Sequence, residues 1–188
     1  MNSQQKAVWE FFDRRASVRS FISKEVNEET VDFLLRCAVT APSNGNMQPW
    51  EFILIRDLEV KKQVVECTFT GYFSKGSNHQ NWILDAPVLL VVCANQKRTK
   101  ARYGEMGILG SIIDTAAAIE HILLAAANLG LASCWVGGFN EVKLKKILKI
   151  PTQVKPIGLL PIGYPGEEVE RKNRLSTEIL THNNYFHN

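Results

Sequence analysis

One long apolar stretch constrains the fold of this chain more than any other feature. It covers residues 108–131, and a helix built from it is apolar on nearly all sides, so it must lie at the centre of the fold or at a subunit interface. Asp114, Glu120 and His121 interrupt the stretch, which favours a buried helix over a membrane span. Asp114 and His121 fall on one side of this helix, where we interpret them as hydrogen-bonded interface groups rather than catalytic groups.

Three further apolar runs predict strands. The run at residues 88–93, VLLVVC, is the most strand-like in the sequence, and we expect it to be central. The run at residues 52–55 is continuous rather than alternating, which indicates a strand covered on both faces. A third strand is expected over residues 154–164, broken by Pro156 and Pro161.

Helices are predicted on either side of these strands. Apolar residues at helical spacing indicate amphipathic helices over residues 4–14 and 58–69. Asn27, followed by two glutamates, is typical of a helix N-cap, and Asn140 has the same position ahead of another amphipathic segment. Residues 95–110 carry lysines, arginines and several glycines, which suggests an exposed, mobile excursion.

Size and composition exclude several classes of protein. A chain of 188 residues is most simply one domain, residues 1–188, that buries roughly 70% of its unfolded surface without disulfides or metals. A net charge of +3 without a basic stripe gives no support for nucleic-acid binding, and the four histidines lack metal-site spacing. The four cysteines form no CxxC, which indicates free thiols in a reducing compartment. With no recognisable signal peptide or membrane span, we predict a cytoplasmic protein.

A polar loop, APSNGNMQPW, occupies residues 41–50. Its two prolines fix backbone angles, and Gly45 permits a turn. The loop also carries uncharged side chains that donate and accept hydrogen bonds, those of Ser43, Asn44, Asn46 and Gln48. Such groups suit a polar, ring-shaped ligand, although the loop alone is more simply a solvated connection.

Two cationic segments lie toward the ends of the chain. Arg15 and Arg19 follow the first predicted helix, and Lys172 and Arg174 belong to the run ERKNR. Cations at a helix C-terminus complement the helix dipole, and a charge run is ordinarily a solvated surface. The functional alternative is an anion site, because guanidinium groups bind phosphate with two parallel hydrogen bonds.

Glycines indicate a second possible contact with a ligand. Gly137 and Gly138, in the segment CWVGGF, let the backbone approach a ligand closely. By contrast, Gly104, Gly107 and Gly110 do not form GxGxxG after a strand, which argues against a Rossmann dinucleotide site.

Four separated motifs together resemble the FMN-dependent nitroreductase family. They are RASVRSF at residues 15–21, PSNGNMQPWEF at 42–52, CWVGGF at 134–139, and GYPGE with KNR between 163 and 174. Their order and spacing extend the resemblance over nearly the whole chain. It implies an α+β nitroreductase-like fold, with a small mixed β-sheet surrounded by helices, and an intertwined homodimer with two FMN molecules in clefts between the subunits.

The resemblance also implies which residues bind the flavin. They are Arg15, Ala16, Ser17, Arg19, Pro42, Ser43, Asn44, Asn46, Gln48, Gly137, Gly138, Lys172 and Arg174. The two cationic segments would surround the phosphate and ribityl chain, with Arg19 toward the pyrimidine edge. The 41–50 loop would reach the same flavin from the other subunit, and the two glycines would bring backbone N–H groups to its N5 side. Where some relatives have an Asn and a Lys before the central strand, this chain has NHQNW at residues 78–82.

The function implied is hydride transfer from NADH or NADPH, through flavin N5, to nitroaromatics, quinones or similar flat acceptors in alternating half-reactions. No side chain is expected to act as a catalytic acid or base, and no metal, nucleic-acid or membrane partner is expected. Two alternatives share the fold, a reductive dehalogenase and a flavin-fragmenting synthase. A third is a flavin-binding protein without turnover.

Overall fold

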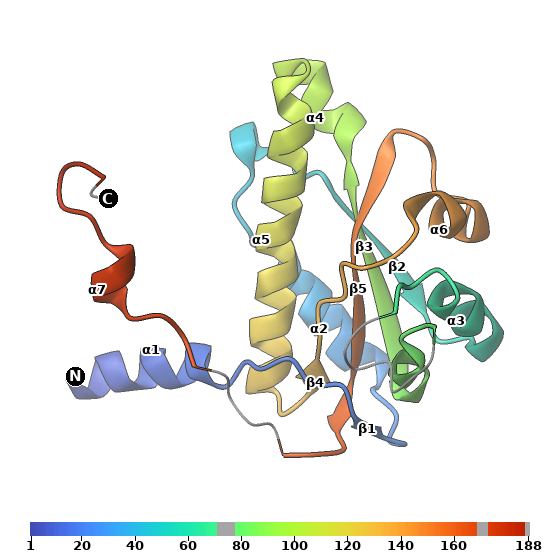
Figure 1. Cartoon of the computed structure of the whole chain (residues 1–188), viewed down its shortest axis with the longest axis horizontal. Helices are drawn as coiled ribbons and strands as arrows, with labels where there is room; N and C mark the ends of the chain where they lie inside the picture. The colour runs from blue at the N-terminus through green and yellow to red at the C-terminus, as the bar shows by residue number, and fades with distance from the viewer. Residues whose placement is uncertain (71–77, 169–172, 187–188) are drawn as a thin grey trace.

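A five-stranded antiparallel sheet forms the centre of the protein, which a computed structural model describes over residues 1–70, 78–168 and 173–186 (Figure 1). The strand order is β1-β5-β3-β2, with β4 paired to β5. The strands are β1 (Phe21–Ile22), β2 (Trp50–Ile55), β3 (Val88–Asn95), β4 (Ala132–Ser133) and β5 (Val154–Pro165). Every ladder between these strands is antiparallel, and the parallel pairing expected of a mixed sheet is limited, in the described part of the chain, to an isolated bridge between Ser17 and Ser133.

The predicted central strand is confirmed. β3 pairs with β2 on one side and with β5 on the other, and its residues are buried from Val88 to Ala94. β5, however, is not broken at its prolines. Pro156 and Pro161 both lie within one continuous strand, and the register against β3 shifts between Val92 and Cys93, opposite the Pro156 end. A bulge of this kind accommodates a proline that cannot donate to the ladder.

Seven α-helices and two 3₁₀ helices are resolved in the described residues. They are α1 (Ser3–Asp13), α2 (Glu28–Ala38), η1 (Asn44–Asn46), α3 (Leu58–Val65), η3 (Asn81–Asp85), α4 (Gln96–Tyr103), α5 (Met106–Asn128), α6 (Glu141–Leu148) and α7 (Thr177–Leu180). The predicted caps are confirmed, because the side chains of Asn27 and Asn140 accept hydrogen bonds from the first turns of α2 and α6. The expected mobile excursion at 95–110 is instead α4 and the start of α5.

Helices cover both faces of the sheet (Figure 1). On one face, α2 and α5 bury an apolar cluster with β3 that includes Leu34, Ile119 and Leu160. On the other face, α3 and α6 enclose a second cluster that includes Val64, Leu89 and Leu144. β3 supplies alternate residues to the two clusters, which explains why its sequence is continuously apolar.

α5 is long and apolar enough to cross a membrane by length and composition, alone among the described helices. Its packing against the sheet and α2 accounts for that composition on one side. On another side Leu109 and Ile113 are exposed, at 63% and 60% of their surface. α5 therefore fills the core and also presents an apolar face outward.

The two ends of the chain extend away from the sheet layers (Figure 1). α1 and α7 have no buried residues, and α1 touches the rest of the protein near its C-terminal end, where Asn128 of α5 donates to the Phe11 carbonyl. Large apolar side chains such as Trp9 and Phe12 stay more than half exposed. All four cysteines are free, as predicted, and three of them are buried.

Candidate functional site

Two of the four sequence motifs lie side by side. After α1 the chain runs next to β4, where the Val18 N–H donates to the Ser133 carbonyl at 3.0 Å and Ser17 bridges Ser133. Ser17 is also hydrogen-bonded to the side chain of Cys134. The arginine-rich segment is thereby fixed next to the chain that leads into Gly137 and Gly138.

Arginines flank this contact. Arg15 is mostly buried, and its Nε lies 3.8 Å from Oε1 of Glu120 on α5. The guanidinium of Arg19 lies 5.9 Å from the centre of the Trp82 ring, and its Nη1 is 3.5 Å from the Ser17 carbonyl. Ala16, between them, is half-buried. One short segment thus presents two cations and a hydroxyl, which is a donor set suited to a phosphate.

Burial and these cations act in opposite directions on the neighbouring acids. Burial raises the pKa of the Cys134 thiol, and Arg19, the Ser17 hydrogen bond and Arg15 partly offset it. Burial likewise raises the pKa of Glu120, with Arg15 and His121 opposing. Cys134 therefore stays a neutral thiol rather than a nucleophile, and the positive field at this site comes from arginine.

The backbone at Gly137 and Gly138 is exposed and lies between isolated bridges at Val136 and Phe139. A side chain built at Gly137 meets nothing within 4 Å among the described residues. The Gly138 carbonyl accepts from the Phe69 N–H at 2.9 Å. Just before these two glycines, the Trp135 indole packs on Gly158, where an added Cβ would lie 2.4 Å from the indole Nε1. A backbone fixed in this way and open to solvent is able to contact a flat ligand.

The 41–50 loop has an unusual backbone. Gly45, Asn46 and Gln48 have φ angles of 55°, 57° and 48°. Left-handed conformations cost non-glycine residues about 1–3 kcal/mol each, least for asparagine. Within the loop, the Ser43 hydroxyl accepts the Gln48 N–H at 3.0 Å, and Pro42 is exposed.

Neighbouring helices hold the loop in place. The Asn44 N–H donates to Asp114 Oδ2 of α5 at 3.0 Å. On the other side, Arg98 of α4 donates to the Gln48 carbonyl and to Glu51, both at 2.6 Å. Asp114, which the sequence indicated as a hydrogen-bonded group, is therefore confirmed as one.

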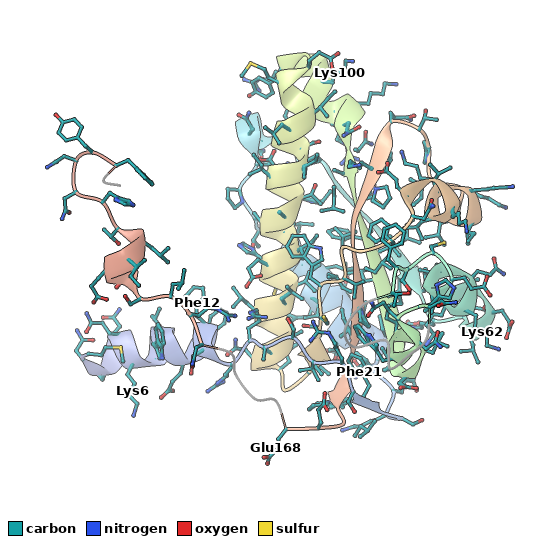
Figure 2. All side chains as sticks on the ribbon, viewed as in Figure 1. Lys6, Phe12, Phe21, Lys62, Lys100 and Glu168 are labelled. Atoms are coloured by element: carbon teal, nitrogen blue, oxygen red, sulfur yellow. The ribbon has the colours of Figure 1, made fainter. Side chains whose placement is uncertain are left out.

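Within one chain, the loop and the arginine segment do not meet. Asp114 and Glu120, which contact them, are six residues apart, so the contacts are separated by about 9 Å along α5 and by about 120° around it. The loop lies toward α4 and the arginines toward β1, at opposite ends of the protein, which Lys100 and Phe21 mark in Figure 2. The structure therefore places Arg15, Ser17 and Arg19 on one segment bound at Ser133, from which the chain continues to Gly137 and Gly138, and it places the loop elsewhere.

The second cationic segment is only partly described. Lys172 lies outside the described residues, and Arg174 is exposed with its Nη1 3.4 Å from the Asn173 carbonyl. Nothing in the described residues tests a shared site with Arg15.

Thr68 organises the segment before the central strand, a role that sequence patterns did not indicate. Its hydroxyl accepts the Gln80 N–H at 2.8 Å, and its carbonyl is 2.9 Å from His79 Nδ1. Gln80 Oε1 then accepts from Trp82 Nε1, and the Trp82 ring stacks on Phe21 beneath Arg19. Only the aromatic residue before the strand was a visible sign of this arrangement.

Comparisons with known proteins agree on one family. The model described as "Nitroreductase family" matches residues 13–164. A putative NADH dehydrogenase/NAD(P)H nitroreductase of Archaeoglobus fulgidus is 34% identical over 158 residues, covering 82% of this chain and 83% of that protein. The FMN reductase [NAD(P)H] of Bacillus subtilis is 28% identical, covering 92% and 71%. Human iodotyrosine deiodinase 1 is also 28% identical, covering 89% and 64%.

Solved structures give the same result. An FMN-dependent nitroreductase from Clostridium difficile superimposes with a TM-score of 0.76 at 27% identity, covering 94% of this chain and 98% of that one. The α+β arrangement of helices on both faces of a small sheet is thus shared with this protein.

Proposed function

The chain belongs to the nitroreductase family, and from that premise we propose that it is an FMN-dependent oxidoreductase that passes hydride from NADH or NADPH to nitroaromatics, quinones or similar flat acceptors. One observation carries the proposal. The segment that carries Arg15, Ser17 and Arg19 is fixed against Ser133, four residues before the exposed backbone at Gly137 and Gly138, which supports a cationic segment next in the fold to a stretch of backbone able to contact a flat ring.

The donor set fits FMN. Arg15 and Ser17, with Lys172 and Arg174 from the other end of the chain, would hold the phosphate and ribityl chain, since charge-assisted hydrogen bonds contribute about 1.5–3 kcal/mol each. When bound, FMN supplies the hydride chemistry at N5. Arg19 would supply positive charge beside the pyrimidine edge, and the backbone at Gly137 and Gly138 would face the ring.

A homodimer completes the site in this proposal. The loop with Ser43, Asn44, Asn46 and Gln48 contacts α5 at Asp114, whereas Arg15 contacts it at Glu120, about 9 Å further along and on another side of the helix, which supports assigning the loop and Arg15 to different flavins of a dimer. The exposed apolar side chains of α1, α5 and α7 are the surface that a second copy would cover. We therefore assign the loop, with Pro42, to the partner's flavin, in an intertwined homodimer of one FMN-binding domain over residues 1–188.

The remaining parts of the proposal concern partners and location. We expect a small-molecule acceptor and neither nucleic acid nor a membrane, in a protein that works in the cytoplasm. Three buried thiols without disulfides support a reducing compartment.

Stopped-flow reduction tests the function. The purified protein should carry FMN, and its absorbance near the flavin maximum should bleach within seconds on mixing with NADH or with NADPH. Adding a quinone or a nitrofuran should then restore the absorbance. A flavin-loaded protein that neither nucleotide bleaches would refute the proposal and support a binding protein without turnover.

Reductive dehalogenation is a second candidate, because iodotyrosine deiodinase 1 is among the similar proteins. The chemically reduced holoenzyme should be mixed with iodotyrosine and, in parallel, with a quinone. Iodide release with slow quinone reduction would favour dehalogenation, and the reverse favours the main proposal. Loss of total flavin under air would instead indicate the flavin-fragmenting reaction.

A further inference from the structure

The 44–48 turn has a conformation that its own sequence does not favour. Gly45, Asn46 and Gln48 all have positive φ, and glutamine is poorly suited to that region. Gly45 also has no room for a side chain, because an added Cβ would lie 2.1 Å from the Tyr103 hydroxyl oxygen of α4. A turn of this kind persists only when surrounding groups determine its shape.

Three side chains outside the turn hold its backbone. Asp114 Oδ2 accepts the Asn44 N–H at 3.0 Å, Arg102 Nη1 donates to the Gly45 carbonyl at 3.3 Å, and Arg98 Nη1 donates to the Gln48 carbonyl at 2.6 Å. Both ends and the middle of the turn are thus bonded to α4 or α5.

Asp114 is the anchor among these groups. It is only 9% exposed, whereas Arg98 and Arg102 lie at the surface. Gly110, one helical turn earlier on the same face of α5, also lies against Asn44, whose Nδ2 would be in ordinary van der Waals contact, at 3.8 Å, with an added Cβ. Two positions on the same face of α5, Gly110 and Asp114, therefore lie against this residue of the loop.

We propose that Asp114 is a positioning residue of the cofactor site, which holds the 44–48 turn in the conformation that presents Ser43, Asn46 and Gln48 to the flavin. This inference rests on the proposed function, since it assumes that the loop contacts FMN. Without the anchor, the turn populates other conformations, and the apparent affinity falls in proportion to the competent fraction.

Two substitutions at Asp114 separate positioning from charge. Asp114→Ala removes the acceptor, and the dissociation constant for FMN should rise about tenfold, the equivalent of about 1.4 kcal/mol. Asp114→Asn keeps an acceptor oxygen and should stay within about threefold of the unchanged protein. Thr115→Val is the matched control, because Thr115 is the next residue of α5, is fully buried and, among the residues that the structure describes, has no hydrogen-bond partner for its hydroxyl.

The measurements are FMN titration of the apoprotein, the KM for the nicotinamide donor, kcat, and the midpoint of thermal unfolding. Weak FMN binding by Asp114→Ala, with recovery in Asp114→Asn and no change in Thr115→Val, supports the inference. An unchanged dissociation constant for Asp114→Ala overturns it, even if the unfolding temperature falls. Equal losses in Asp114→Ala and Asp114→Asn overturn it too, because charge rather than the hydrogen bond would then matter.

A second pair of variants covers the case in which Asp114→Ala fails to fold. Arg98→Met removes the bond to the Gln48 carbonyl, whereas Glu51→Gln removes the carboxylate partner of Arg98 and leaves that bond possible. Weaker FMN binding only in Arg98→Met supports a clamped turn, and unchanged binding in both overturns it. If the unsubstituted protein binds no FMN, the proposed function fails; if it binds FMN and all variants match it, only the positioning role fails.

Discussion

Replacing Arg15 by alanine should weaken FMN binding, and the neighbouring arginine provides the control. Arg15 is held mostly buried beside Ser17, which makes it the cation best fixed to receive a phosphate. Losing one charge-assisted interaction of about 1.5–3 kcal/mol corresponds to a rise of about 10- to 100-fold in the dissociation constant. Arg14→Ala removes the same charge from a side chain whose Nη1 donates to Asn128 Oδ1, and it should change the constant less than about threefold.

A substitution at Glu120 gives a second test of whether Arg15 binds the phosphate of FMN. Its carboxylate faces Arg15 at 3.8 Å, so it competes with a phosphate for that guanidinium. Glu120→Gln removes the competing charge, and FMN should bind at least as tightly as before. The FMN dissociation constants of Arg15→Ala and Arg14→Ala should also differ less at high salt, because salt screens the attraction between a guanidinium and a phosphate.

The assay is quenching of FMN fluorescence on titration with apoprotein, with thermal unfolding run in parallel to exclude loss of fold. Equal effects of Arg14→Ala and Arg15→Ala would refute the reasoning, since the site would then sense only net charge. Weaker FMN binding by Glu120→Gln would also refute the reasoning, because the Glu120 carboxylate would then contact the flavin and would not compete with its phosphate for Arg15.

Three further predictions concern the scaffold. Gly158→Ala should lower the free energy of unfolding by about 1–3 kcal/mol in urea titrations, because the new methyl meets the Trp135 indole at 2.4 Å; an unchanged value would mean that the indole moves freely. Burial raises the pKa of the Cys93 thiol to about 12, from an ordinary value of 9.0. Between these pH values the thiol is ionised in the unfolded chain and protonated in the folded protein, so the free energy of unfolding should fall as pH rises from about 9 toward 12. Cys93→Ala should flatten that part of the pH profile, and an identical slope would contradict this origin. Thr68→Val should release the 78–82 segment, seen as faster amide hydrogen exchange at Gln80 with little change at β3; uniform exchange rates would argue against it.

Much of the secondary structure was predictable because it depends on neighbours in the chain. The side chains of Asn27 and Asn140 cap helices by accepting the backbone N–H three residues later in the chain. The continuous apolar sequence of β3 indicates that the strand is buried on both faces. β5 was harder, because a proline pattern that ordinarily interrupts a strand is tolerated here by a register shift against β3. Whether a strand accommodates prolines depends on its partner's hydrogen bonds, which its own sequence does not contain.

In the candidate site, too, local features were predictable from the sequence and long-range contacts were not. The residue types at Arg15, Ser17, Arg19 and the glycine pair were recognisable from their motifs, and so was their chemistry, because charge and backbone freedom belong to the residues themselves. The contact of Ser17 and Val18 with Ser133, and the separation of the 41–50 loop from the arginine segment, follow from how α5 and β4 pack. The Asn44–Asp114 bond joins residues 70 positions apart, and the Arg98–Glu51 pair joins residues 47 apart. No local periodicity encodes contacts of that span, because they exist only once the helices lie against the sheet.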